Sequence, residues 1–332
     1  MTLGDPAGIG PEVTLKALAA GGARGAEVLL LGRASFFSSL ARRLGLRLKF
    51  LDVSDPGKKS VRGVYLCHSL DELPSGFRPG RADDRLTRAA VRSIETAVAL
   101  CLCGEGDAIV TPPINKAALL RAGFRIPGHT EFLASLSGTK RFEMMLVGGG
   151  LRVVLVTRHL ALKDVPRSVT ARAVEETILL ADRELRRSFG VARPRLVVCG
   201  LNPHAGEEGR FGREEIERIA PAVRRARKKA AGTVDGPLSP DALFHDAWRG
   251  RWDAVVCMYH DQGLIPLKMV SRGSGVNVTL GLPFVRTSPD HGTAYDIAGR
   301  NAADGGSMAE AMRLAVTLSL NRRKHERAHR RG

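Results

Sequence analysis

The strongest constraint on the fold is the alternation of short apolar strands with amphipathic helices along most of the 332 residues. Strands are predicted at residues 27–31, 46–51, 107–111, 144–147, 153–156, 196–199 and 253–258, and helices at residues 34–44, 85–103, 169–189, 214–229 and 308–320. This pattern favours an α/β architecture with a largely parallel sheet and crossover helices. Because open sheets of this kind bind ligands at the carboxyl ends of their strands, the residues after each strand are the most informative about function.

Histidines follow three of these strands closely. His159, His204 and His260 occupy equivalent places after successive strands, and His129 begins a further helix after a Pro-Gly turn. Three neutral imidazoles suit Zn, Co, Fe or Ni and leave a coordination position open for a substrate oxygen. A single histidine in such a place is more often structural, and no local signature such as His-Glu-x-x-His is present. The spacing therefore suggests a metal site without establishing one.

A second polar group lies near the C-terminal end of the chain. Lys268, Asn277 and Arg286 follow one another at intervals of nine residues, in a segment rich in glycine. Such a group would suit a phosphate or carboxylate, which arginine can bind in a bidentate manner, although the two cations could also be surface charges.

Residues 4–12 predict a helix start whose N–H groups could face an anion or a cofactor. Neither the dinucleotide fingerprint Gly-x-Gly-x-x-Gly nor a P-loop occurs, so the residues alone indicate a metal-assisted enzyme acting on a small anionic substrate.

The formal net charge of +17 raises the alternative of a basic nucleic-acid-binding protein. Only 5% of the residues are aromatic, and no basic stretch carries the interleaved aromatic side chains that stack on bases, so we expect no nucleic-acid partner. The basic residues 322–332 are predicted to be a frayed, solvated end, and residues 232–241 a surface loop. No apolar run is long enough for a membrane span, and no leader pattern is present. Five cysteines without a Cys-x-x-Cys pair indicate a reduced, cytoplasmic protein without a membrane partner.

Several long motifs in a fixed order resemble the 4-hydroxythreonine-4-phosphate dehydrogenase family of pyridoxal 5′-phosphate (vitamin B6) biosynthesis. The motifs lie at residues 4–12, 128–132, 200–207, 258–263 and 281–288, and the similarity runs from residue 2 to about residue 320. Residues 291–299 are also similar to the cofactor loop of isocitrate and isopropylmalate dehydrogenases. The resemblance implies their fold, two α/β/α domains around a central cleft. Residues 1–112 with 285–332 would form the cofactor-side domain, and residues 113–284 the domain for metal, substrate and dimerisation.

The resemblance also implies which residues form the site. The metal ligands fall on His159, His204 and His260, and a homodimer shares this site across its interface, so that one histidine comes from the second subunit. Arg158, beside the first ligand, stands where the family commonly has a small residue, and we expect it to point away from the cation. Substrate contacts fall on His129, Thr130, Lys268, Asn277 and Arg286. Cofactor contacts fall on Gly8, Gly10, His291, Gly292, Thr293 and Asp296. Asp261 and Lys116 are the candidates for the catalytic base, and Asp261 could instead orient a histidine.

The implied reaction is the oxidation of 4-phosphohydroxy-L-threonine at C3 with NAD or NADP and a divalent metal such as Zn, Mg or Co. The product, 2-amino-3-oxo-4-phosphooxybutanoate, would lose CO2 to give 3-amino-2-oxopropyl phosphate. Asp296 favours NAD, whereas the nearby Arg300 and Arg286 favour NADP. The closest alternative is a dehydrogenase of 4-phospho-D-threonate or erythronate in sugar-acid catabolism, because these substrates share the metal, phosphate and cofactor requirements.

Overall fold

The computed structural model describes residues 1–55, 63–70, 73–74, 76–126 and 128–329, and the chain divides into two compact units. Unit 1 comprises Met1–Lys140 and Leu282–Ser319, and unit 2 comprises Arg141–Gly281 and Leu320–Gly332. The first boundary lies later than the expected one at residue 112, because the helices at residues 116–121 and 129–136 pack on the long helix of unit 1. The end of the chain joins the other unit, through contacts described below.

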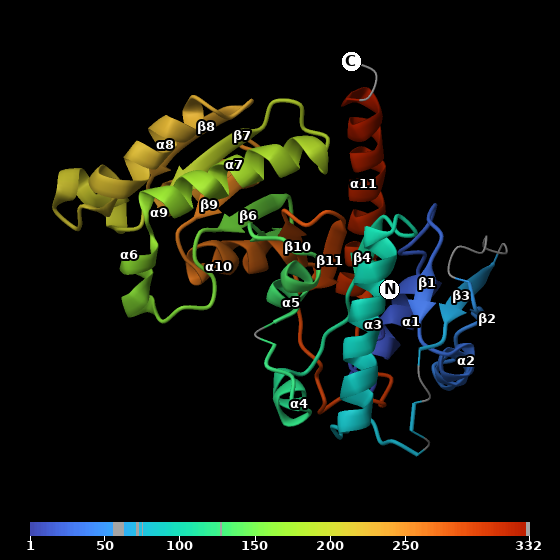
Figure 1. The fold of residues 1–332 in the computed structure, drawn as a ribbon. Helices are drawn as coiled ribbons and strands as arrows, with labels where there is room; N and C mark the ends of the chain where they lie inside the picture. Colours follow the sequence, from blue (N-terminus) through green and yellow to red (C-terminus); the bar gives the residue numbers. More distant parts are fainter. Residues whose placement is uncertain (56–62, 71–72, 75, 127, 330–332) are drawn as a thin grey trace. The chain divides into compact units, whose positions relative to one another are not determined.

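Unit 1 contains a small parallel sheet and a separate strand pair (Figure 1). The sheet has the order β1-β3-β2, and β4 pairs with β11 in parallel. The strands of unit 1 are β1 (Leu29–Leu31), β2 (Lys49–Val53), β3 (Val64–His68), β4 (Ala108–Val110) and β11 (Val285–Pro289). Its helices are α1 (Gly10–Ala19), α2 (Ala34–Arg43), α3 (Asp84–Leu102), α4 (Lys116–Arg121), α5 (His129–Leu136) and the first part of α11 (Gly306–His329). The Asp83 side chain caps α3 by accepting from the Arg85 backbone N–H at 2.8 Å.

Unit 2 is built on strands in the order β10-β5-β6-β9-β7-β8. Its strands are β5 (Glu143–Gly148), β6 (Leu151–Leu155), β7 (Arg195–Cys199), β8 (Thr233–Leu238), β9 (Ala254–Cys257) and β10 (Val276–Leu280). Strand β5 is antiparallel to β6 and β10, while the pairs β6–β9, β9–β7 and β7–β8 are parallel. Its helices are η1 (Leu162–Asp164), α6 (Val165–Ser168), α7 (Ala171–Arg187), η2 (Pro203–Gly209), η3 (Glu215–Ile219), α8 (Ala220–Arg227), α9 (Pro240–Trp248) and α10 (His260–Ser271).

The core of unit 2 fills the space between its sheet and the helices α9 and α10. Val153, Val197 and Val255 from three adjacent strands pack with Leu243 of α9 and Leu267 of α10 in one buried cluster. These strand residues are fully or almost fully buried, which fits the continuous apolar runs of strands covered on both faces. Such a sheet fixes the strand ends firmly, and these ends carry the predicted histidines.

The predicted α/β class is confirmed, but two local predictions are wrong. Residues 232–241 form β8 and the start of α9 instead of a loop. Residues 322–329 are not frayed, since α11 continues to His329 and buries Arg322. The Arg322 guanidinium donates to Glu184 Oε2 at 2.9 Å and to Ser188 Oγ at 2.8 Å, and these contacts join the end of the chain to unit 2.

None of the helices in the described residues combines the length and apolar character that crossing a membrane requires. The expected arrangement of two domains about a central cleft stays a prediction.

Candidate active site

Two of the predicted metal ligands lie together in unit 2. Strands β6 and β9 pair in parallel, and their hydrogen bonding continues past the strand ends, where the Thr157 N–H donates to the Met258 carbonyl at 3.2 Å. This pairing carries His159 and His260 to the same place, with their ring centroids 5.5 Å apart. His260 also begins α10, and its Nδ1 lies 2.7 Å from Asp261 Oδ1. A carboxylate on Nδ1 fixes the tautomer that leaves Nε2 able to bind a cation.

The third predicted ligand stands apart from this pair. His204 lies on the turn η2, exposed to solvent, with its ring centroid 6.4 Å from that of Phe211. Within the described residues, no three side chains of His, Cys, Asp or Glu converge on a point that could hold a metal ion. A single chain therefore brings His159 and His260 together and leaves His204 outside the group.

The charge next to His159 is neutralised within unit 2. Arg158 donates to Glu143 Oε2 at 3.1 Å and to the Phe142 carbonyl at 3.2 Å, and its guanidinium lies 4.9 Å from the Phe142 ring centroid. Burial raises the pKa of Glu143 to about 7, although Arg158 acts in the opposite direction. The guanidinium is therefore held on the first residues of β5, in accord with the expectation that it points away from a bound cation.

Unit 1 contains a buried arginine at the centre of the predicted substrate residues. Arg286 on β11 is only 2% exposed, and it donates to Thr111 Oγ1 from Nε at 3.2 Å and from Nη2 at 2.8 Å. Burial lowers the pKa of Arg286 to about 10, and the nearby Glu131 opposes this shift. The guanidinium therefore still carries its charge at neutral pH. Thr111 was not among the predicted site residues, although its position at the end of a predicted strand was a usable signal.

His129 lies beside this arginine at the first position of α5. Burial lowers the pKa of His129 well below its usual range, and the charges of Arg286 and Lys116 lower it further. The ring is therefore neutral, and its Nε2 is shielded from solvent without a hydrogen-bond partner among the described residues. Thr130 is buried on the next position of the helix. Lys116, His129, Thr130 and Arg286 thus form a polar set with the Glu131 carboxylate nearby. The two cations of this set are suited to an anionic ligand.

The other two predicted substrate residues lie on separate elements of unit 2. Lys268 is exposed on α10, two turns after His260. Asn277 is on β10, where its Nδ2 lies 3.2 Å from Met144 Sδ. The Asn277 Oδ1 atom is shielded from solvent and is not hydrogen-bonded to any part of the chain that the structure describes. Such a group is available to a ligand.

The predicted cofactor residues of unit 1 lie side by side. The Ile9 N–H donates to the Thr293 carbonyl at 2.9 Å, and a Cβ at Gly8 would stand only 2.8 Å from the same oxygen. Tyr295 donates from its hydroxyl to the Asp5 carboxylate, which adds a second link between the two segments. Asp296 and Gly292 are exposed, and His291 Nε2 is shielded, with no hydrogen bond to it from any described residue. Gly10 instead packs against Pro112, where a Cβ would approach the proline Cβ to 3.2 Å.

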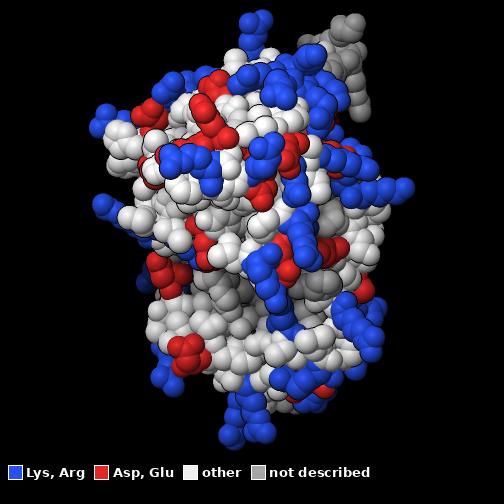
Figure 2. Space-filling view, turned by 90° about the vertical axis from the view of Figure 1, so that its left-hand side faces the viewer, with Lys and Arg blue, Asp and Glu red and all other residues white. Residues whose placement is uncertain are grey.

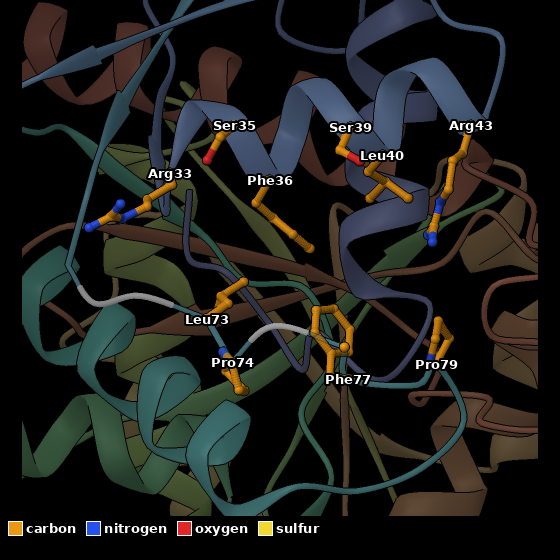
Figure 3. Close-up of a pocket in the computed structure, with 11 residues that line it drawn as sticks. Arg33, Ser35, Phe36, Ser39, Leu40, Arg43, Leu73, Pro74, Phe77 and Pro79 are labelled. Atoms are coloured by element: carbon orange, nitrogen blue, oxygen red, sulfur yellow. The ribbon is translucent and has the colours of Figure 1, made fainter.

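A pocket of about 460 Å³ in unit 1 was not foreseen from the sequence (Figure 3). It lies between one face of α2 and the segment that carries Phe77, and its polar groups include Arg33 and Arg43. A smaller adjoining cavity shares Phe77 and Arg43 and reaches Gly8 and Gly299, next to the predicted cofactor segments. The hydrophobic periodicity of the sequence does not predict this pocket, because the pocket depends on the packing of two segments that lie apart in the sequence.

The basic residues are distributed among acidic ones on the surface. Figure 2 shows lysine and arginine side chains over much of one face, with aspartate and glutamate among them. Glu175, for example, accepts from Lys229 Nζ at 2.7 Å and also pairs with Arg225. The positive charge is therefore partly compensated by local ion pairs.

Comparison with known proteins shows the family of the chain. The family model described as pyridoxal phosphate biosynthetic protein PdxA matches residues 24–315. A relative from Geobacter metallireducens, named 4-hydroxythreonine-4-phosphate dehydrogenase, is 47% identical over 96% of this chain and 94% of its own. A relative from Cupriavidus necator, named D-threonate 4-phosphate dehydrogenase, is 45% identical over 97% of both chains. The crystal structure of 4-hydroxythreonine-4-phosphate dehydrogenase from Klebsiella pneumoniae has a TM-score of 0.86 and 43% identity, and covers 96% of this chain and 98% of its own. The chain therefore belongs to the PdxA family of pyridoxal phosphate biosynthetic proteins.

Proposed function

We propose that this protein oxidises 4-phosphohydroxy-L-threonine at C3 to 2-amino-3-oxo-4-phosphooxybutanoate, which decarboxylates to 3-amino-2-oxopropyl phosphate. The observation that carries the proposal is the buried cationic Arg286 beside the neutral His129, whose Nε2 has no hydrogen-bond partner among the described residues, in a chain with full-length relatives named for this activity. A buried arginine is suited to a phosphate or carboxylate, because its planar guanidinium can donate two parallel hydrogen bonds to such a group. His129 and Thr130 would orient the bound anion, and Lys268 and Asn277 would add a further charge and an amide.

A divalent cation, such as Zn, Mg or Co, would be held by His159 and His260 of one subunit and by His204 of a second subunit. The imidazole nitrogens, and the Asp261 carboxylate that orients His260, fit such an ion. The separation of His204 from the other two histidines supports a site completed by another copy of the chain. When bound, the cation lowers the pKa of a substrate hydroxyl, and the nicotinamide of NAD or NADP accepts hydride.

A homodimer is supported by exposed apolar side chains on the segments that carry the three histidines. Ile265 and Met269, one turn apart on α10, are 60% and 75% exposed, and Leu162 in the segment after His159 is 70% exposed. Phe211, whose ring is near that of His204, is 51% exposed. Large apolar side chains left exposed in this way are suited to a subunit interface. Association through this face would bury them and join the ligands of two chains.

Other residues of this chain would accept the substrate proton and bind the cofactor. Asp261 is engaged by His260, so we assign it an orienting role and keep Lys116, next to His129, as the candidate for the catalytic base, which would act in its unprotonated form. The paired segments at Gly8 and Thr293 would hold the adenosine end of the cofactor, with His291 and Asp296 as polar contacts. Arg286 is bound to Thr111, which leaves Arg300 as the arginine that would favour a 2′-phosphate. The free thiols of all five cysteines fit the reducing cytoplasm.

The deciding experiment measures formation of reduced nicotinamide with purified protein, each candidate metal, and NAD or NADP. We expect turnover of 4-phosphohydroxy-L-threonine that is abolished by a chelator and restored by a divalent cation. The relative named D-threonate 4-phosphate dehydrogenase favours one alternative, in which 4-phospho-D-threonate or erythronate is the substrate. Turnover of these sugar-acid phosphates alone would replace the proposed substrate. Steeply salt-dependent binding to duplex DNA, without any turnover, would instead support the nucleic-acid alternative.

A further inference from the structure

The turn that carries His204 has a strained backbone. Its residues from His204 to Glu208 all have positive φ, with values of 51° at His204, 53° at Ala205, 40° at Glu207 and 55° at Glu208. Residues other than glycine rarely adopt this left-handed conformation, because their Cβ approaches the backbone too closely. Such strain persists only where the surroundings hold the segment in place, and it is concentrated at functional sites.

A buried carboxylate holds the start of this turn. Glu215 is 4% exposed, and its Oε1 accepts from the backbone N–H groups of Leu201 and Asn202, both at 2.7 Å. Its Oε2 accepts from the Asn202 side-chain amide at 2.9 Å, and Glu214 accepts from the same amide at 2.8 Å. The Glu215 carboxylate therefore binds both residues that lead into the turn, through three hydrogen bonds.

The turn packs tightly against this carboxylate. A Cβ at Gly206 would stand 2.7 Å from Glu215 Oε2, and one at Gly200 would stand 2.9 Å from Ala205 Cα. Neither glycine can be replaced without moving the turn or the carboxylate. Glu215 also begins a π-helical turn, a geometry that is frequent at functional sites.

A second buried side chain ties the turn to the strand that leads to His260. Gln262 is 8% exposed on the first turn of α10. Its Nε2 donates to the Gly200 carbonyl at 2.7 Å, and its Oε1 accepts from the Met258 N–H at 2.6 Å. One amide thus joins the end of β7, which enters the His204 turn, to the segment just before His260.

We propose that Glu215 is a positioning residue for the metal ligand His204, and that Gln262 links its turn to the segment of His260. This inference rests on the metal site of the proposed function. Replacing Glu215 with glutamine keeps the size but puts an N–H₂ group against donors that it cannot satisfy. The turn then loses part of its anchor and relaxes away from the left-handed conformation, and His204 moves with it.

The test compares Glu215→Gln with Glu217→Gln in the full-length protein. Glu217 lies on the same π-helical turn but is exposed and pairs with Arg213, so it is a matched control. Co²⁺ binding is measured by competition with a chelator, together with the visible absorption of the bound ion, thermal unfolding and circular dichroism. We expect Glu215→Gln to weaken Co²⁺ binding by roughly 10- to 100-fold and to change the absorption bands, with the secondary structure retained. Glu217→Gln is expected to bind as the unaltered protein does.

The outcomes separate this inference from the function on which it rests. Co²⁺ binding by Glu215→Gln equal to that of the unaltered protein would overturn the positioning role alone. Failure of the unaltered protein to bind Co²⁺ would reject the metal site and this inference with it. If Glu215→Gln does not fold, Glu215→Asp is measured in the same way, since it keeps the charge but withdraws the carboxylate by one methylene. Unaltered affinity in that folded variant would also contradict the proposal.

Discussion

At the scale of single residues, the surroundings of Arg286 in unit 1 say most about the kind of ligand that we propose. Its guanidinium is buried and cationic, and it donates to the Thr111 hydroxyl from two nitrogens. A buried charge needs compensation, to which the nearby Glu131 carboxylate contributes and to which a bound anion would add. The spacing of Lys268, Asn277 and Arg286 suggests an anion site, but no pattern in the sequence predicts that Arg286 lies beside His129 in unit 1.

Arg286→Lys should therefore impair substrate binding more than folding. Lysine keeps the charge but loses the planar fork, and a charge-assisted hydrogen bond contributes about 1.5–3 kcal/mol, so kcat/KM should fall by roughly 10- to 100-fold. The measurement is steady-state kinetics with thermal unfolding at the same pH. Arg313→Lys, at an exposed ion pair on α11, is the control and should leave both quantities unchanged. Equal kcat/KM for Arg286→Lys and the unaltered protein would remove Arg286 from the anion site.

At the scale of elements, much of the sheet could be predicted and several junctions could not. Strands such as β6, β7 and β9 are continuous apolar runs, and burial on both faces makes such runs easy to recognise. Strand β8 was misread because it contains Gly236 and Pro237. These residues are tolerated because β8 lies at the edge of the described sheet, next to β7. A glycine is also needed at position 236, since a Cβ there would stand 2.4 Å from the Val198 carbonyl oxygen. The roles of Glu215 and Gln262 could not be predicted for a related reason. Their hydrogen-bond partners lie in other segments of the chain, so no local pattern identifies them.

The contact between β5 and the segment after β6 yields a pH-dependent prediction. Glu143 has a pKa of about 7 in the folded protein against 4.5 in a free chain. As the pH rises between these values, the unfolded chain loses the proton first, so the free energy of unfolding falls and stays lower above pH 7. Glu143→Gln cannot titrate, and we expect its Tm relative to the unaltered protein to rise between pH 5 and pH 8, by the equivalent of about 1–3 kcal/mol. Glu326→Gln, more exposed and paired with Arg187, is the control. Parallel Tm curves for Glu143→Gln and the unaltered protein would refute the assignment.

At the scale of the whole molecule, the division into two units separates the two kinds of chemistry. The proposed anion-binding residues around Arg286 and the proposed cofactor segments belong to unit 1, whereas the three histidines belong to unit 2. The family resemblance supplied this list of residues, but it could not tell which of them meet within one chain. Two of the histidines meet and the third does not, so the subunit from which each ligand comes becomes a measurable property.

Hybrid dimers test this property directly. If each metal site combines His159 and His260 of one subunit with His204 of the other, a hybrid of His204→Ala and His260→Ala subunits has one intact site. Because a two-fold dimer contains two equivalent sites, a hybrid purified through two different affinity tags should have about half the activity and metal content of the unaltered dimer. Each parent dimer alone should have almost none. A hybrid of His159→Ala and His260→Ala is the matched control, since both changes then damage the same half of each site and neither site is restored. Inactivity of both hybrids would mean that each chain assembles its own ligands, which would require His204 to move toward His159 and His260 when the metal binds.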